Sequence, residues 1–154
     1  MSQMGLTDVS AQQVAVVRRT VAMAELGSFY TEALGAVAAA VESAGGTLAG
    51  PAFGWYHGVP AETADVAAGF PVAGVPEGTL GGEVVVLERP AGMAATTVHV
   101  GSYDTLTETY RALEAWLRSR ELEPADIVWE EYLTGPETQP DPSLWQTHVV
   151  WPLQ

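Results

Sequence analysis

The run Trp129-Glu130-Glu131-Tyr132 holds the residues whose types and spacing could do chemistry. Alternate side chains of a strand point to opposite faces of its sheet, so one of the two glutamates must face each side. A glutamate on an apolar side has its pKa raised by the loss of water. Such a group can balance an organic cation or act as a general base. Alternation alone does not decide which glutamate is inward, and a solvent-facing glutamate on a partly exposed strand is an equally good interpretation.

Aromatic side chains near the edges of predicted elements could complete such a site. They are Trp55, Tyr56, Trp129 and Trp145. Each contact between a cation and an aromatic ring contributes about 0.5–2 kcal/mol. A delocalised organic cation also loses its water at lower cost than a metal ion, so one buried glutamate could neutralise it. Core packing is the alternative for these rings, and it is the favoured interpretation for Trp116 and Trp151.

Other common kinds of site have little support in the sequence. The histidines, His57, His99 and His148, lie far apart and lack the spacing of metal ligands. No serine lies in a GxSxG elbow, and Gly78-x-x-Gly81-Gly82 lacks the setting of a phosphate-binding loop. Because cysteine is absent, disulfides and thiolate metal sites are excluded. We therefore expect no metal and no cofactor.

Length and composition predict one folded domain with an acidic surface. The chain has 154 residues, 47% of them hydrophobic and 16% charged. Six arginines stand against 19 acidic residues, for a net charge of -13, so nucleic acids and anionic membranes are poor partners. The first 13 residues lack the features of a signal peptide, and no window holds 18 continuous apolar residues. We therefore expect a cytoplasmic protein.

Two similar sets of elements are predicted, joined by a glycine-rich connector at 75–82. Each set contains a strand, a helix and two further strands, and an additional strand opens the second set. Gly27 is expected to end the first strand and Ser28 to cap the helix after it. The predicted elements are, in order, strand 14–26, helix 29–43, strands 52–58, 65–72, 83–88 and 93–100, helix 104–120, and strands 127–134 and 146–152.

Matching residues indicate an internal repeat. Gly27-Ser28-Phe29 matches Gly101-Ser102-Tyr103, Leu48 matches Leu122, and Tyr56 matches Tyr132, all at nearly the same separation along the chain. We therefore expect a single α+β domain over 1–154, built from two β-α-β-β units at about 14–75 and 83–154. A cleft between two such halves is a favoured place for a ligand.

Three segments of the chain carry a pattern known from one family. They are 88–92 (Glu-Arg-Pro-Ala-Gly), 99–106 with Tyr110, Leu113 and Trp116, and 129–136 (Trp-Glu-Glu-Tyr-Leu-Thr-Gly-Pro). The pattern resembles the GyrI-like small-molecule-binding family, which includes the effector-binding domains of AraC-type and MerR-type multidrug regulators. The likeness is clear over 83–154 and looser over 14–75. It implies a tandem of SHS2-type units that form a concave antiparallel sheet with a central groove and carry their helices on the outer face.

The resemblance also implies a function. Members often bind lipophilic cationic drugs through a buried glutamate ringed by aromatic residues. The family's E-x-Y pattern falls on Glu130 and Tyr132, which favours Glu130 over Glu131 as the inward residue. The segment Gly101-Ser102-Tyr103 departs from the family's Gly-Pro-Tyr. No helix-turn-helix domain accompanies this sequence, so the resemblance implies no DNA binding by the chain itself, although a separate regulator could be its partner.

Three functions follow as hypotheses. The preferred one is a binding or sequestering protein for hydrophobic, often cationic, small molecules, with Glu130 as counter-charge and Tyr56, Tyr132, Trp129 and Trp145 as aromatic walls. The second is an enzyme that opens strained cyclopropyl electrophiles, with Glu130 as general base and Tyr132 as hydrogen-bond donor. The third is a protein-interaction module of the gyrase-inhibitor type. No residue is assigned a firm catalytic role.

Overall fold

The computed structural model describes residues 4–58, 60–134 and 138–154. Gly135 and Pro136, which end the segment 129–136, lie outside the described residues. The chain forms two compact units, Ser10–Ala91 and Met1–Val9 with Gly92–Gln154. Their described residues contain two α-helices and ten β-strands with antiparallel pairings, so the predicted α+β class is confirmed. Neither described helix is long and apolar enough to cross a bilayer.

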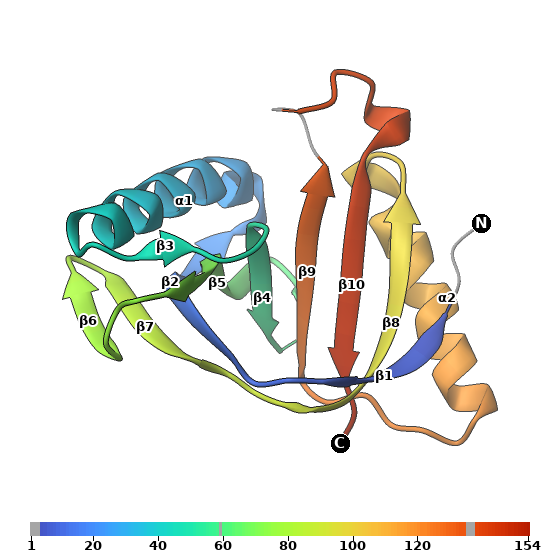
Figure 1. Cartoon of the computed structure of the whole chain (residues 1–154). Helices are drawn as coiled ribbons and strands as arrows, with labels where there is room; N and C mark the ends of the chain where they lie inside the picture. The colour runs from blue at the N-terminus through green and yellow to red at the C-terminus, as the bar shows by residue number, and fades with distance from the viewer. Residues whose placement is uncertain (1–3, 59, 135–137) are drawn as a thin grey trace. The chain divides into compact units, whose positions relative to one another are not determined.

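The unit Ser10–Ala91 contains helix α1 and is called the α1 unit below. Its strands pair in the order β4-β5-β2-β7-β6, and the short β3 also pairs with β5. Helix α1 packs on β2 and β5 (Figure 1), and its buried residues are Phe29, Ala33, Val37 and Val41. The elements are β2 Gln12–Ala22, α1 Leu26–Ser43, β3 Thr47–Leu48, β4 Phe53–His57, β5 Thr63–Ala73, β6 Gly78–Gly81 and β7 Val84–Arg89.

The other unit contains helix α2 and is called the α2 unit. Its strands pair in the order β1-β8-β10-β9, and α2 packs against β8. Leu113 and Leu117 of the helix form a buried cluster with Ala95 and Val149 of the sheet. The elements are β1 Gly5–Val9, β8 Gly92–Val100, α2 Leu106–Ser119, β9 Ile127–Thr134 and β10 Gln146–Pro152.

The two units share one strand order, β7-β2-β5-β4 in the α1 unit and β1-β8-β10-β9 in the α2 unit. Their helices begin at Leu26 and at Leu106, each directly after a short 3-10 turn. Gly27 is therefore the second residue of α1, whereas Gly101 precedes the 3-10 turn before α2. The expected match between these two glycines is wrong.

Cross-strand register extends the correspondence to the last strands. The equivalent rows are Val17–Ala68–Gly54 in the α1 unit and Thr97–Val149–Glu130 in the α2 unit. Gly54 thus occupies the place that Glu130 has in the α2 unit. Further along the same strands, Tyr56 corresponds to Tyr132, as the matching of the two tyrosines in the sequence predicts.

The start of α1 differs from the prediction. The strand ends at Ala22, Met23–Glu25 form a 3-10 turn, and the helix begins at Leu26. Ser28 lies inside the first helical turn, where its hydroxyl donates to the carbonyl oxygen of Glu25 at 3.0 Å. A serine hydroxyl that bonds to the backbone behind it is not available as an N-cap acceptor. The predicted capping role of Ser28 is therefore wrong.

The glycine-rich connector contains a strand as well as turns. Gly78–Gly81 forms β6, which pairs with β7, and the turn between them is made at Gly82 with a φ of +54°. The strand β7, which the expected repeat boundary places in the second half, pairs with β2 of the α1 unit. The short strands β1 and β3 are also absent from the prediction.

Candidate functional site

Glu130 of β9 lies inside the α2 unit, with 6% of its surface exposed. The hydroxyl of Tyr110 donates a hydrogen bond to its Oε2 at 2.6 Å, and the hydroxyl of Tyr132 donates to its Oε1 at 2.9 Å. Both carboxylate oxygens are therefore held by tyrosines. Glu130 is thus the glutamate of the pair that lies in the buried interior of the unit.

The local fold explains why these groups meet. Tyr110 is the fifth residue of α2, on the same helix face as Leu113 and Leu117. Glu130 and Tyr132 are separated by one residue in β9, so their side chains share one face of the sheet. Val149 lies opposite Glu130 on β10 and packs with the helix leucines. The carboxylate thus lies on the sheet face that α2 covers.

Burial raises the pKa of Glu130, because the charged form loses its water in this position. The hydrogen bonds from Tyr110 and Tyr132, and the nearby imidazole of His99, lower the pKa and offset part of this rise. A positive charge placed beside the carboxylate would also favour its ionised form. Such a charge would therefore favour release of the proton from Glu130.

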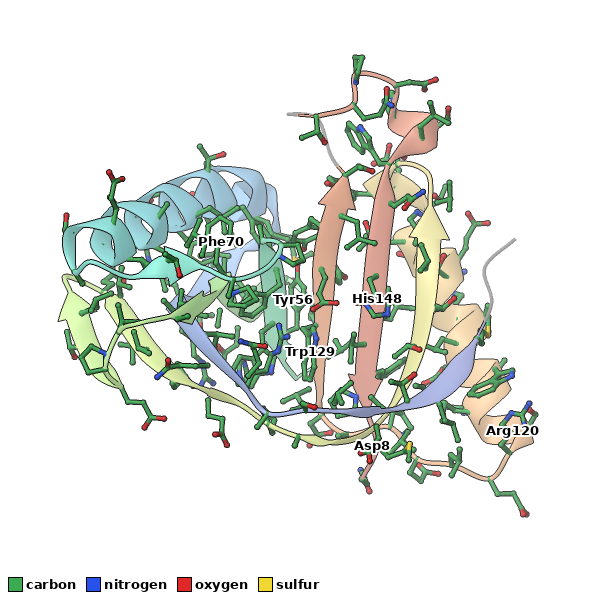
Figure 2. All side chains as sticks on the ribbon, in the orientation of Figure 1. Asp8, Tyr56, Phe70, Arg120, Trp129 and His148 are labelled. Atoms are coloured by element: carbon green, nitrogen blue, oxygen red, sulfur yellow. The ribbon has the colours of Figure 1, made fainter. Side chains whose placement is uncertain are left out.

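Glu131, the other of the two adjacent glutamates, lies on the opposite face of the same sheet. Glu131 lies opposite His148, and its Oε1 is 2.7 Å from the His148 Nδ1. Trp129 shares this face with Glu131, because the two are separated by one residue in β9. Figure 2 labels Trp129 and His148 on their two strands. Trp129 therefore does not lie on the same side of the sheet as Glu130.

A chain of aromatic rings leads from Glu130 to Trp145. Tyr103 meets Tyr132 edge to face, with ring centroids 5.8 Å apart, and it packs on Trp145 at 4.9 Å. The indole of Trp145 donates to the carbonyl oxygen of Gln139 at 2.7 Å. The structure thus connects Trp145 with Tyr132 through Tyr103.

Trp151 belongs to the core on the helix side of the sheet, as predicted. Its ring meets that of Tyr110 edge to face at 5.7 Å, and it packs against the cluster around Leu113. Its indole nitrogen donates to the carbonyl oxygen of Ala125 at 3.1 Å. This ring helps to hold Tyr110 in position above the carboxylate.

Tyr56 lies in the α1 unit and is buried. Its hydroxyl shares a hydrogen bond of 2.9 Å with the hydroxyl of Tyr30. Tyr30 is the fifth residue of α1, as Tyr110 is of α2. The α1 unit therefore has the two tyrosines of the site, with glycine in place of the glutamate.

Three further polar side chains are buried on the face of Glu130. His99 places Nε2 2.9 Å from the carbonyl oxygen of Ser102 and Nδ1 2.6 Å from the hydroxyl of Thr109. In the neutral imidazole, Nε2 therefore donates to the carbonyl and Nδ1 accepts from the threonine. Thr97 and Thr147 are also buried, and their hydroxyls have no hydrogen-bond partner among the described residues.

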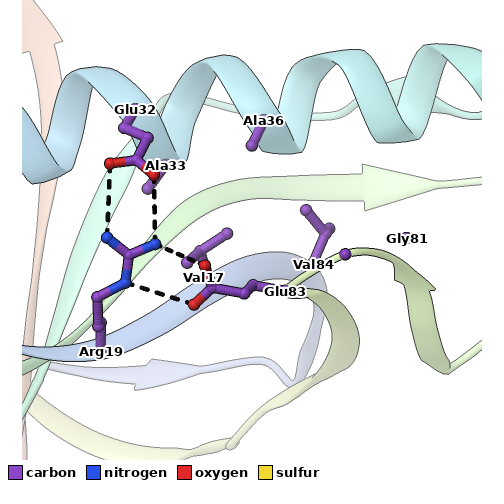
Figure 3. A pocket seen from close by; sticks show the side chains of 9 residues that line it. Val17, Arg19, Glu32, Ala33, Ala36, Gly81, Glu83 and Val84 are labelled. Carbon is purple, nitrogen blue, oxygen red and sulfur yellow. Dashed lines mark hydrogen bonds and ion pairs between the residues drawn. The ribbon is translucent and has the colours of Figure 1, made fainter.

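Two hollows lie within the α1 unit. One, of about 140 Å³, is lined by residues of β2, α1 and the β6–β7 turn. Figure 3 shows Arg19 in this hollow, between the carboxylates of Glu32 and Glu83. The other, of about 280 Å³, is lined by Trp55 and His57 with side chains of β2, β5 and β7. Of the aromatic side chains predicted for the site, Trp55 lines the second hollow, and Glu130 lines neither.

Several residues of this site are absent from the sequence prediction. Tyr110 is predicted only as part of the apolar stripe of its helix, and His99 only as a lone histidine. A buried tyrosine hydroxyl needs a polar partner, so a tyrosine in that stripe was a signal for a polar group under the helix. Thr97 and Thr147 gave no such signal. Within ranges 4–58, 60–134 and 138–154, no three His, Asp or Glu side chains are grouped as metal ligands.

Comparison with solved structures shows the same fold in other proteins. The C-terminal domain of EcmrR aligns with 100% of this chain and 98% of its own, at 23% identity and a TM-score of 0.87. In a complex of EcmrR with DNA, the alignment covers 99% of this chain but only 57% of that chain, at 24% identity and a TM-score of 0.84. This chain thus spans little more than half of that relative.

Two more distant structures carry information about ligands or activity of their own. SAV2435, solved bound to tetraphenylphosphonium, aligns over 99% of this chain and 94% of that chain, at 12% identity and a TM-score of 0.68. A hydrolase encoded by lin2189 from Listeria innocua aligns over 99% and 92%, at 13% identity and a TM-score of 0.71. At these identities the likeness shows the fold alone. Comparison with curated proteins gives no match.

A family model gives the assignment that the structural likenesses alone do not. It matches residues 3–154, nearly the whole chain, and describes a GyrI-like small-molecule-binding domain. The chain therefore belongs to the GyrI-like family of small-molecule-binding domains.

Proposed function

We propose that this domain binds hydrophobic cationic small molecules and uses Glu130 as the counter-charge. The observation that carries the proposal is the burial of a carboxylate whose two described hydrogen-bond donors are neutral tyrosines. An ionised carboxylate in such a place is costly unless a positive charge accompanies it. A lipophilic cation supplies that charge and adds apolar surface. Binding of tetraphenylphosphonium by SAV2435 supports the same ligand class.

The surroundings of Glu130 suit an organic cation better than a hydrated metal ion. Tyr110 and Tyr132 lie against the carboxylate, and Trp151 and Tyr103 pack on these two rings. Aromatic faces attract a delocalised positive charge, with about 0.5–2 kcal/mol for each contact. In this proposal Tyr132, Tyr103 and Trp145 form the aromatic wall of the site.

The test compares two ligands of nearly equal shape, methyltriphenylphosphonium and the neutral triphenylphosphine oxide. Calorimetric titration of the full chain would measure both affinities in wild type and in Glu130→Gln. A carboxylate about 4 Å from a unit charge contributes about 4 kcal/mol at an effective dielectric constant near 20. Since every 1.4 kcal/mol is a factor of ten in affinity, we therefore expect Glu130→Gln to weaken binding of the phosphonium by about 1,000-fold and to leave binding of the oxide nearly unchanged.

Glu131→Gln is the matched control, since it makes the same change one residue along the strand on the opposite face. This variant should bind both ligands as wild type does. Equal losses for the phosphonium and the oxide in Glu130→Gln would contradict the proposal, because shape rather than charge would then explain the change.

A second candidate function is hydrolysis of a strained cyclopropyl electrophile, and the raised pKa of Glu130 favours it. A carboxylate of raised pKa can accept a proton from an attacking water at neutral pH. The fold likeness to the hydrolase encoded by lin2189 is compatible with this activity. Incubation of wild type and Glu130→Gln with such an electrophile, followed by mass spectrometry, should reveal a product heavier by one water. Turnover equal in both proteins and in buffer would reject it.

A further inference from the structure

The α2 unit buries two threonine hydroxyls beside the proposed cation site. Thr147 is 0% exposed and Thr97 is 2% exposed. Neither hydroxyl has a hydrogen-bond partner among the described residues. A buried hydroxyl without a partner is unfavourable, because it has lost its hydrogen bonds to water. Most buried polar side-chain atoms have a hydrogen-bond partner. Two buried threonine hydroxyls without one, on the same face of a sheet, therefore need an explanation other than packing.

The pairing register places both hydroxyls on the face that carries Glu130. Thr97 lies opposite Val149, which lies opposite Glu130. Thr147 lies two residues before Val149 in β10, so it is a diagonal neighbour of Glu130, about 7–8 Å away. Thr97 is two strands from Glu130, which corresponds to about 10 Å at the usual strand spacing. Thr147, Thr97 and Glu130 thus lie on one face of the sheet, around Val149.

The side chains on either side of Thr147 already have other partners. Thr147 lies opposite Tyr132 on β9 and opposite His99 on β8. The hydroxyl of Tyr132 donates to Glu130, and the two nitrogens of His99 contact Ser102 and Thr109. The neighbouring Tyr132 and His99 side chains thus bond elsewhere, and the Thr147 hydroxyl keeps its donor and acceptor capacity unused among the described residues.

We propose that Thr147 and Thr97 are specificity-determining residues that form hydrogen bonds with a polar group of the bound cation. This inference rests on the proposed function, and it narrows the ligand class. The site would prefer cations that also carry N–H or O–H groups within reach of the threonines. A cation whose whole surface is hydrocarbon would gain the charge interaction with Glu130 but would leave both hydroxyls without partners.

The test uses ethidium, which carries two amino groups, and 5-ethyl-6-phenylphenanthridinium, the same cation without them. Fluorescence titration of the full chain should show wild type binding ethidium about tenfold more tightly than the deaminated analogue. Thr147→Val replaces the hydroxyl by a methyl group of similar size. This variant should lose most of the preference for ethidium and keep its affinity for the analogue, and Thr97→Val should lose part of the preference.

Matched variants separate specificity from packing. Thr96→Val makes the same change on the opposite face of β8 and should bind both cations as wild type does. Thr147→Ser keeps the hydroxyl and should retain the preference, whereas Thr147→Ala should not. This pair also decides the question if Thr147→Val fails to fold.

Three outcomes distinguish the two proposals. Selective loss of the ethidium preference in Thr147→Val and Thr147→Ala supports the inference. If Glu130→Gln abolishes binding of both cations but the threonine variants keep the preference, or lose both ligands equally, the inference fails and the proposed function stands. If wild type binds neither cation, or binds both regardless of Glu130→Gln, the proposed function itself fails.

Discussion

Tyr30 and Tyr56 join their hydroxyls directly at 2.9 Å in the α1 unit. At the corresponding positions of the α2 unit, the two tyrosines are joined through the carboxylate of Glu130. The register of the strands places Gly54 where Glu130 lies in the other unit. One arrangement of helix and strands thus holds a neutral tyrosine pair in one unit and a tyrosine–carboxylate bridge in the other.

This difference predicts unequal costs for removing the helix tyrosine hydroxyl. Tyr110→Phe removes a bond to a carboxylate, which contributes about 1.5–3 kcal/mol when that group is ionised, whereas Tyr30→Phe removes a neutral bond of about 0.5–1.5 kcal/mol. Urea unfolding above the raised pKa of Glu130 should therefore show a larger loss of unfolding free energy for Tyr110→Phe. At pH 4 the two losses should approach each other, because Glu130 is then protonated. Equal losses at both pH values would contradict an ionised bridge.

The raised pKa of Glu130 predicts a specific dependence of stability on pH. Its ordinary value is 4.5, and the folded protein holds the proton to higher pH than the unfolded chain does. Between pH 4.5 and the folded-state pKa, the unfolded state ionises first, so wild type loses stability as pH rises, by up to about 1.4 kcal/mol per pH unit. Glu130→Gln cannot ionise and escapes this loss.

Denaturant unfolding of both proteins between pH 4 and pH 9 checks this expectation. The stability of wild type relative to Glu130→Gln should fall from pH 4.5 upward and then level off above the folded-state pKa. Similar dependence of unfolding free energy on denaturant concentration in both proteins would show that the denatured states are comparable. Stability curves that run parallel over the whole range would show that Glu130 has an ordinary pKa.

The same proton should compete with a bound cation. Methyltriphenylphosphonium keeps its charge at every pH, so any change of its affinity with pH comes from the protein, and Glu130 is the proposed counter-charge. Below the raised pKa, affinity for wild type should fall by up to about tenfold per pH unit, since the proton must leave before the charge pair forms. Affinity of the neutral triphenylphosphine oxide, and of Glu130→Gln for either ligand, should change little with pH. Calorimetric titration at several pH values measures all of these.

The sequence predicts the long elements well and the short ones poorly. The strand 127–134 and the helix 104–120 have strong periodic patterns, and they match β9 and α2 closely. By contrast, β6 is the four-residue segment Gly78–Gly81 with glycine at both ends, so its strand preference is weak and its pairing with β7 decides its conformation. The 3-10 turn Met23–Glu25 begins with two apolar residues that continue the apolar end of β2, which hides the point where the strand ends.

The candidate site is predictable only in part. Alternation in β9 shows that one glutamate is inward, and the E-x-Y pattern identifies Glu130. The pairing of Glu130 with Tyr110 depends on which face of the sheet α2 covers, and no local pattern contains that information. The position of Trp129 was predictable, because neighbouring residues of a strand cannot line the same face as each other. Treating Trp129 and Glu130 as parts of one groove neglected this alternation.

Gly69 offers a test of the sheet that supports the α1 unit. It lies in β5 between β2 and β4, opposite Val16 and Phe53. A Cβ atom at this position would collide with the backbone carbonyl oxygen of Ala15, and a backbone atom cannot move aside as the end of a side chain can. We therefore expect Gly69→Ala to lower the free energy of unfolding by about 2–4 kcal/mol. Thermal and urea unfolding would measure the change.

Gly35→Ala is the matched control, since it adds the same methyl group where nothing lies within 4 Å. Gly35 is exposed in the interior of α1, and alanine is favoured over glycine there by about 0.5–1 kcal/mol, so this variant should be more stable than wild type. Opposite signs for the two glycine variants would show that close approach of β5 to β2, rather than glycine content, controls stability. A neutral Gly69→Ala would mean that the two strands lie further apart at this point than the structure has them.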